Sequence, residues 1–196
     1  MAHQYTTDAL VLGTRESGEA SKTLVLFTRT FGLIYGSAKS LRMGKSKLSA
    51  LLQTTSLGAV TLVRGKRSWK VVGGMEKVNA FYFLSLYPER KALMVRILKL
   101  VRRLVHGEEK NEALFNVLEE FIKHITFLNP NDTELPALER LVALRILASL
   151  GYTTLAPELQ SCVVESVITS DVLTFIGEKR VLATNEINRA LKEAQL

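Results

Sequence analysis

Few side chains of this sequence stand at the spacings that catalysis or metal binding requires. The three histidines, His3, His106 and His124, lie far apart, and no H-E-x-x-H, G-x-S-x-G or G-x-G-x-x-G motif occurs. The single cysteine, Cys162, makes neither an internal disulfide nor a four-cysteine zinc site and is typical of a small buried apolar residue. Unless distant residues assemble a site, the sequence predicts a protein that is not an enzyme and holds no metal or cofactor.

Gly44, Lys45 and Ser46 form the one segment with the look of a nucleotide-binding loop, since they follow an expected strand and precede an expected helix. A loop of that kind needs a further glycine five positions before its second glycine, so that backbone amides can wrap the phosphates. Lys39 stands at that position, and no strand ending in an aspartate follows to hold magnesium. ATP binding is therefore not expected.

Basic residues instead gather in two short stretches that contain no acidic residue. These residues are Lys39, Arg42, Lys45 and Lys47 in the first stretch and Arg64, Lys66, Arg67 and Lys70 in the second. Cationic loops with aromatic residues among them are typical of surfaces that hold phosphates and stack bases. Trp69 is open to either a stacking or a core role, whereas Phe31 and Tyr35 are expected in the core. A merely solvated surface is the alternative interpretation of the loops.

The net charge of +7 is unevenly divided along the chain. Residues 1–79 carry a net charge of +8, residues 80–105 a net +5 and residues 106–196 a net −6. Nine of the 12 glycines precede residue 80, and all 4 prolines follow it. We therefore expect a polyanion-binding domain over 1–79 and a second domain over 80–196, whose acidic part is free for protein partners.

The first domain is predicted to be a small β-barrel. Its expected strands are Ala9–Thr14, Thr23–Thr28, Leu33–Ala38, Ala59–Val63 and Trp69–Val72. Lys47–Gln53 has the leucine spacing of one or two helical turns, and a short helix after the third of five strands is the OB-fold layout. An SH3-like barrel and a split five-stranded sheet fit the same pattern.

The second domain is predicted to be helical, which makes the fold class α+β. The expected helices are Pro88–Val105, Asn111–Leu128, Leu135–Leu150 and Thr184–Ala194. The first has an apolar stripe, with Arg96, Lys99, Arg102 and Arg103 on the opposite face. That face either extends a nucleic-acid path, through Arg96, Lys99 and Arg103, or is simply solvated. Ser161–Arg180 is ambiguous, because Val163–Ile168 is β-like but short.

The order of short motifs resembles the RecO family of recombination mediators. Over about the first 80 residues the matching segments are Asp8–Leu12, Gly18-Glu19, Thr23–Thr28, Gly32–Ile34, Ala38–Arg42, Lys45–Lys47, Leu52-Gln53 and Arg64-Gly65. The resemblance resumes at Leu147–Tyr152 and Pro157–Leu159, where the family has a similar Leu-Gly-Tyr helix end. Each motif is loose alone, but their order over most of the chain is specific.

The resemblance implies a DNA repair protein that needs no catalytic residue. Such mediators bind single- and double-stranded DNA, anneal complementary strands, and act with RecR, single-strand-binding protein and RecA. Their place would be the cytoplasm, on the nucleoid, and not a membrane. An RNA-binding or ribosome-associated OB-fold protein is the alternative that the residues leave open.

The sequence also departs from the family pattern. Many members carry a four-cysteine zinc module after the Leu-Gly-Tyr helix, whereas here only Cys162 stands at about the place of the first cysteine. We expect no zinc and a reduced carboxy-terminal region, which puts the partner contacts made there in doubt.

The first basic stretch gives a testable prediction about salt dependence. If Arg42, Lys45 and Lys47 each neutralise one phosphate, changing all three to Ala should make the slope of log affinity against log salt shallower by about 2 units on single strands. Fluorescence anisotropy with a labelled oligonucleotide measures that slope. An unchanged slope in a folded variant would move the binding site to the second basic stretch.

Overall fold

The computed structural model of the chain describes residues 3–17, 21–39, 51–66, 68–128, 130–152, 155–165 and 167–194, with the backbone alone for residues 16, 17, 21, 22 and 39. The chain divides into two units, Met1–Leu86 with Val105–Glu112, and Tyr87–Leu104 with Ala113–Leu196. The sequence placed the domain boundary at residue 79. The last strand does end at Asn79, and the first unit runs on to Leu86 and also takes in residues 105–112.

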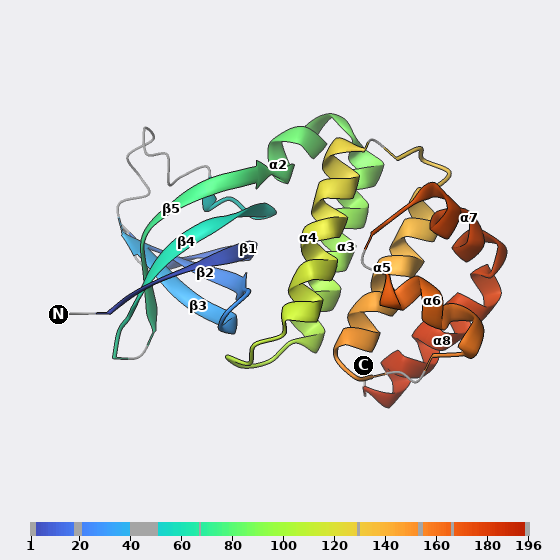
Figure 1. The fold of residues 1–196 in the computed structure, drawn as a ribbon. Coiled ribbons are helices and arrows are strands. Elements are labelled where there is room, and N and C mark those ends of the chain that lie inside the picture. The colour runs from blue at the N-terminus through green and yellow to red at the C-terminus, as the bar shows by residue number, and fades with distance from the viewer. Residues whose placement is uncertain are drawn as a thin grey trace. The chain divides into compact units, whose positions relative to one another are not determined.

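The first unit contains a closed five-stranded barrel (Figure 1). Its strands are β1 Gln4–Ser17, β2 Ser21–Thr28, β3 Gly32–Lys39, β4 Ser56–Arg64 and β5 Trp69–Asn79. They are joined in the order β1-β2-β3-β5-β4, with β3 and β5 parallel and the other pairs antiparallel. This arrangement confirms the predicted OB-fold rather than a split sheet.

Closure of the barrel depends on the length of β1. Gln4 to Leu10 pair with β4, while Ala9 to Ser17 pair with β2, so one strand serves two neighbours. The register with β2 shifts between Val11 and Gly13, which marks a β-bulge. Since a bulge bends a strand and increases its twist, it lets β1 pass from one side of the barrel to the other.

The barrel core consists of side chains at alternate strand positions. These residues are Ala9, Val11, Leu24, Leu26, Ile34, Ala38, Val60, Leu62, Trp69 and Val71, together with Leu51 and Leu52 from the β3–β4 connection. The helix predicted over Lys47–Gln53 lies largely outside the described residues. Leu51 and Leu52 are nevertheless 0% and 4% exposed, so the described end of that segment packs into the barrel core.

Short helical segments, α2 Ala80–Phe83 and the 3-10 helix η1 Leu84–Leu86, end the first part of the barrel unit. The described helices of the second unit are α3 Pro88–Leu104, α4 Glu112–Phe127, α5 Leu135–Ser149, α6 Pro157–Val164, α7 Ser170–Glu178 and α8 Arg180–Glu193. The first three match their predicted ranges closely, whereas α8 begins four residues before the expected Thr184. None of the described helices has the length and apolar character needed to span a bilayer.

Helix α5 is the centre of the second unit (Figure 1). Ten of its 15 residues are buried, and it contacts α3, α6, α7 and α8. Apolar residues surround the whole helix, so its pattern does not show the single stripe of a surface helix. The buried residues of α3, α7 and α8 supply the facing sides of this core.

The ambiguous stretch after Ser161 is not a strand over its described residues. Val163 and Val164 belong to α6, and α7 follows from Ser170. Arg145 of α5 holds the segment between these helices, since its guanidinium donates to the carbonyl oxygens of Cys162 at 2.9 Å and Val167 at 3.1 Å. Burial lowers the pKa of Arg145. The buried Arg145 side chain thus satisfies two backbone carbonyl groups, which strand neighbours would satisfy in a sheet.

The tight turn between β2 and β3 generates a prediction about stability. Gly32 has φ +66°, and a Cβ there would lie 2.0 Å from the carbonyl oxygen of Glu109. An alanine in the left-handed conformation costs roughly 1–2 kcal/mol by itself. Because the added Cβ also meets Glu109, Gly32→Ala should lower the free energy of unfolding by more than that amount. Urea denaturation followed by the fluorescence of Trp69, the one tryptophan, measures the loss.

Gly107→Ala is the matched control for this turn, because Gly107 has φ +75° and no atom within 4 Å of an added Cβ. Equal losses in the two variants would contradict the close approach of Glu109 to the turn.

Candidate nucleic-acid interface

Several predicted contact residues lie where the structure gives no side chain. Arg42, Lys45, Lys47 and Arg67 fall outside the described residues. Lys39 ends β3, where its backbone pairs with Ser21. The candidate interface is therefore built from the β4–β5 hairpin and the strands beside it.

The β4–β5 hairpin carries three exposed cations, Arg64, Lys66 and Lys70. Gly65 donates a backbone hydrogen bond to the carbonyl oxygen of Ser68 at 3.0 Å, which closes the turn. A Cβ on Gly65 would lie 2.6 Å from that oxygen, so glycine is needed for the close approach. The hairpin places the three exposed cations at the edge of the barrel.

Trp69 belongs to the core, the second of the two roles that its sequence position allowed. It is 2% exposed, and its ring lies 4.7 Å from that of Phe31 and 5.8 Å from that of Tyr5, measured between centroids. Phe31 packs against the barrel core, as predicted. A ring covered in this way offers no open face to a base, so Trp69 is corrected from a stacking platform to a core residue.

Arg64 is engaged with groups that the sequence did not place beside it. Its guanidinium lies 4.6 Å from the centroid of the Trp69 ring and forms an ion pair with Glu108. Glu108 also accepts a hydrogen bond from Nε1 of Trp69 at 3.2 Å. The second basic stretch contains no acidic residue in the sequence, but in the fold its Arg64 pairs with a carboxylate 44 residues further along the chain. No local sequence signal reveals this contact.

Tyr35 is the residue that sequence reasoning assigned wrongly to the core. Its side chain is 56% exposed. Ser37 pairs with Lys70 across the parallel β3–β5 contact, and Tyr35 is two positions before Ser37. Because side chains of a strand alternate between faces, Tyr35, Ser37 and Lys70 share the outer face of the barrel. An exposed aromatic ring and a lysine on one face are the elements of a surface that binds single strands.

All four cationic positions on the polar face of α3, Arg96, Lys99, Arg102 and Arg103, are exposed, and one of them is paired. Arg96 forms two hydrogen bonds with Glu139 of α5, at 2.6 Å and 2.8 Å. These hydrogen bonds raise the pKa of Arg96. Lys99, Arg102 and Arg103 are exposed. Arg96 is therefore partly committed to holding α5, and the exposed positive charge of α3 rests mainly on the other three residues.

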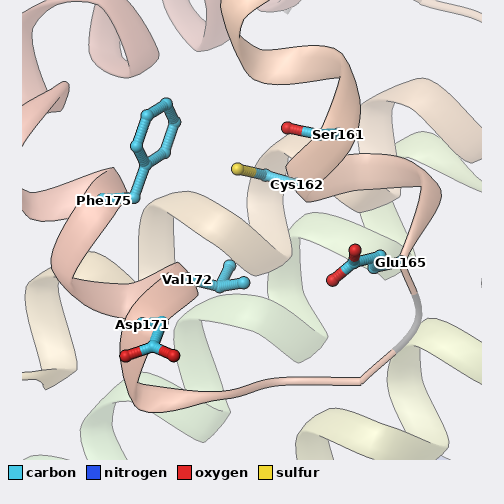
Figure 2. A pocket seen from close by; sticks show the side chains of 6 residues that line it. All are labelled: Ser161, Cys162, Glu165, Asp171, Val172 and Phe175. Carbon is cyan, nitrogen blue, oxygen red and sulfur yellow. The ribbon is translucent and has the colours of Figure 1, made fainter.

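A pocket of about 210 Å³ lies in the second unit, between α6 and α7 (Figure 2). Its lining residues are Ser161, Cys162, Glu165, Asp171, Val172 and Phe175. Glu165 follows the end of α6 and Asp171 lies in the first turn of α7, and the Cys162 thiol points toward the Phe175 ring. Two negative charges disfavour a phosphate ligand, so this pocket is set apart from the nucleic-acid interface.

Metal-binding chemistry finds no support over the part of the chain that the structure describes. No group of three or more His, Cys, Asp or Glu side chains there is placed to hold an ion. His124 is buried in α4, and this burial lowers its pKa.

Comparison with known proteins decides the family. The model of the recombination protein O N-terminal domain matches residues 1–81, and that of the C-terminal domain matches residues 88–192. The chain belongs to the recombination protein O family. The resemblance found in the sequence is confirmed, and the assignment agrees with the prediction that the chain is not an enzyme.

Curated RecO relatives show the extent of the similarity. The chain is 32% identical over 157 residues to the DNA repair protein RecO of Alkaliphilus metalliredigens, covering 80% of this chain and 61% of that protein. It is 29% identical over 160 residues to RecO of Dehalococcoides mccartyi, covering 82% and 60% respectively. RecO of Myxococcus xanthus is 28% identical over 162 residues, covering 81% and 62%. The match thus spans about 60% of the length of these relatives.

The outer barrel face of this RecO chain generates a prediction about base stacking. If Tyr35 stacks on a base, Tyr35→Ala should weaken binding of single-stranded DNA about tenfold, because one stacked base contributes roughly 1–3 kcal/mol. Duplex binding should change little, since paired bases are not free to stack on a side chain. Anisotropy titrations with both forms of DNA measure the two effects.

Tyr82→Ala is the control for this prediction, because Tyr82 is 74% exposed in the same unit but lies in α2. An equal loss on single and double strands, or an equal loss in the Tyr82 variant, would count against stacking at Tyr35.

Proposed function

We propose that this chain binds single- and double-stranded DNA and anneals complementary strands in DNA repair. The observation that carries the proposal is the outer barrel face, where exposed Tyr35 and Lys70 lie beside the cationic hairpin of Arg64 and Lys66. Membership of the recombination protein O family, whose relatives are named DNA repair proteins, supports the same role.

The proposed mechanism is electrostatic and needs no catalytic side chain. Two DNA strands repel each other through their phosphates, and lysine and arginine side chains reduce that repulsion when they hold both backbones. The ammonium groups of Lys66 and Lys70 are exposed and have no described carboxylate partner, so they can contact phosphate directly. Bases then remain free to find their complements, provided that stacking on the protein is weak enough to reverse.

Further contacts extend the proposed path beyond the hairpin. The following residues are also proposed to hold DNA phosphates: Lys39, Arg42, Lys45 and Lys47 of the first basic stretch, Arg67 of the second, and Arg96, Lys99 and Arg103 of α3. As a recombination mediator, the protein would act with RecR, single-strand-binding protein and RecA, in the cytoplasm and on the nucleoid. The acidic part of the chain, residues 106–196, is proposed to bind protein partners rather than DNA.

An annealing assay tests the proposal. Lys66→Ala combined with Lys70→Ala should slow the annealing of two complementary oligonucleotides severalfold at low salt, because two phosphate contacts are lost. A fluorophore and a quencher on the two strands follow the reaction. The same assay on strands coated with single-strand-binding protein tests the mediator role, and a competing RNA of equal length tests specificity for DNA.

Lys179→Ala combined with Lys192→Ala is the matched control, since both lysines are exposed in the helical unit and the change in net charge is equal. If both double variants slow annealing equally, only net charge matters and the hairpin is not a contact. If the parent protein prefers RNA, the function belongs to the RNA-binding class instead.

A further inference from the structure

The segment Val105–Glu112 runs from the end of α3 to the first residue of α4, and it belongs to the barrel unit rather than to the unit that holds the rest of those helices. It is rich in acidic residues, with Glu108, Glu109 and Glu112 beside a single lysine, Lys110. A hydrogen bond from Lys110 lowers the pKa of Glu112, so that carboxyl is held ionised. We name residues 105–112 the acidic strap.

The acidic strap contacts the barrel at three points. Glu108 binds Arg64 and Trp69, as described above. The backbone of Glu109 lies against Gly32 in the β2–β3 turn. Glu112 lies 3.6 Å from the guanidinium of Arg29, which follows β2. Two of the three contacts therefore pair a strap carboxylate with a barrel arginine.

The Glu108 contact has the geometry of an anion site. One carboxylate oxygen faces the Arg64 guanidinium and the other accepts from the indole N–H of Trp69, so two donors from the hairpin converge on one anion. A phosphodiester also presents two adjacent oxygens to such a donor pair, and guanidinium groups bind phosphate well. Tyr5, whose ring contacts both Phe31 and Trp69, adds a 41% exposed aromatic side chain beside the site.

We propose that the Glu108 carboxylate occupies a phosphate site of the barrel, and that single-stranded DNA displaces the acidic strap to reach it. This inference rests on the proposed DNA-binding function and adds its regulation. The side chains of Arg64 and Glu108 are 58% and 42% exposed, and an ion pair in water at such exposure holds weakly. A strand that contacts several cations and releases counterions outcompetes one carboxylate.

Whatever displaces the acidic strap must also accept a hydrogen bond from the indole N–H of Trp69. Trp69 is 98% covered, and its Nε1 has Glu108 as its acceptor. If the strap leaves without replacement, a donor at the barrel end loses its partner, which is costly. A phosphate oxygen at the same place restores the hydrogen bond, so the strap and the DNA exclude each other at this site.

Glu108→Ala in the full chain tests the proposal. The variant should bind a labelled oligothymidine about three- to fivefold more tightly than the parent protein, the range that an exposed ion pair allows. Glu158→Ala is the control, because Glu158 is exposed in α6 and its loss changes the net charge equally. A gain confined to Glu108→Ala supports competition at the site, and an equal gain in both variants overturns it.

Trp69 provides an independent measurement, since it is the only tryptophan of the chain. Its emission should change when the parent protein binds oligothymidine, and acrylamide should quench it more strongly in Glu108→Ala than in the parent. Oligothymidine that binds with no change in Trp69 emission overturns the strap proposal but leaves the proposed function intact. Absence of DNA binding in both proteins overturns both proposals. If polyglutamate changes the Trp69 emission and oligothymidine does not, the strap is displaced by an acidic protein partner. That result would overturn the assignment of the site to DNA.

Discussion

The two-residue parallel contact between β3 and β5 fixes the arrangement of everything on the barrel. Gly36 is paired with Trp69 and Ser37 with Lys70, and this short ladder joins the two edges that β1 cannot reach. Because strand side chains alternate, the register sends Trp69 into the core and Lys70 to the outer face. A shift by one residue would bury the lysine and expose the indole. The cationic face and the aromatic core at the barrel end therefore share one origin.

Charge along this chain differs from charge on the folded unit. The first 79 residues are basic and the residues after 105 are acidic, yet residues 105–112 fold onto the barrel and bring Glu108 and Glu112 to Arg64 and Arg29. The cations that remain without a described carboxylate partner at the hairpin, Lys66 and Lys70, are the ones with charge available for phosphate at once. The paired arginines are available only when their carboxylates leave, so the barrel holds two kinds of cationic position.

The helical unit depends on a different device, the burial of one arginine in its central helix. Arg145 is 1% exposed, and its guanidinium binds the carbonyl oxygens of Cys162 and Val167. Such hydrogen bonds offset the cost of removing a cation from water, which would otherwise be several kcal/mol. They tie Cys162 of α6 and Val167, which precedes α7, to the central helix α5.

The sequence by itself determined the α+β class, the strand positions, the three helices α3 to α5 and the family, because these follow from local periodicity and from the order of short motifs. It also located the cationic hairpin, since charge clustering is visible along the chain. Only the tertiary structure decided that Trp69 is core, that Tyr35 is exposed and that Arg64 meets Glu108. These outcomes depend on strand register and on contacts between residues more than 30 positions apart. Local propensity carries no information about either, because both are set by how the barrel closes and by what then packs against it.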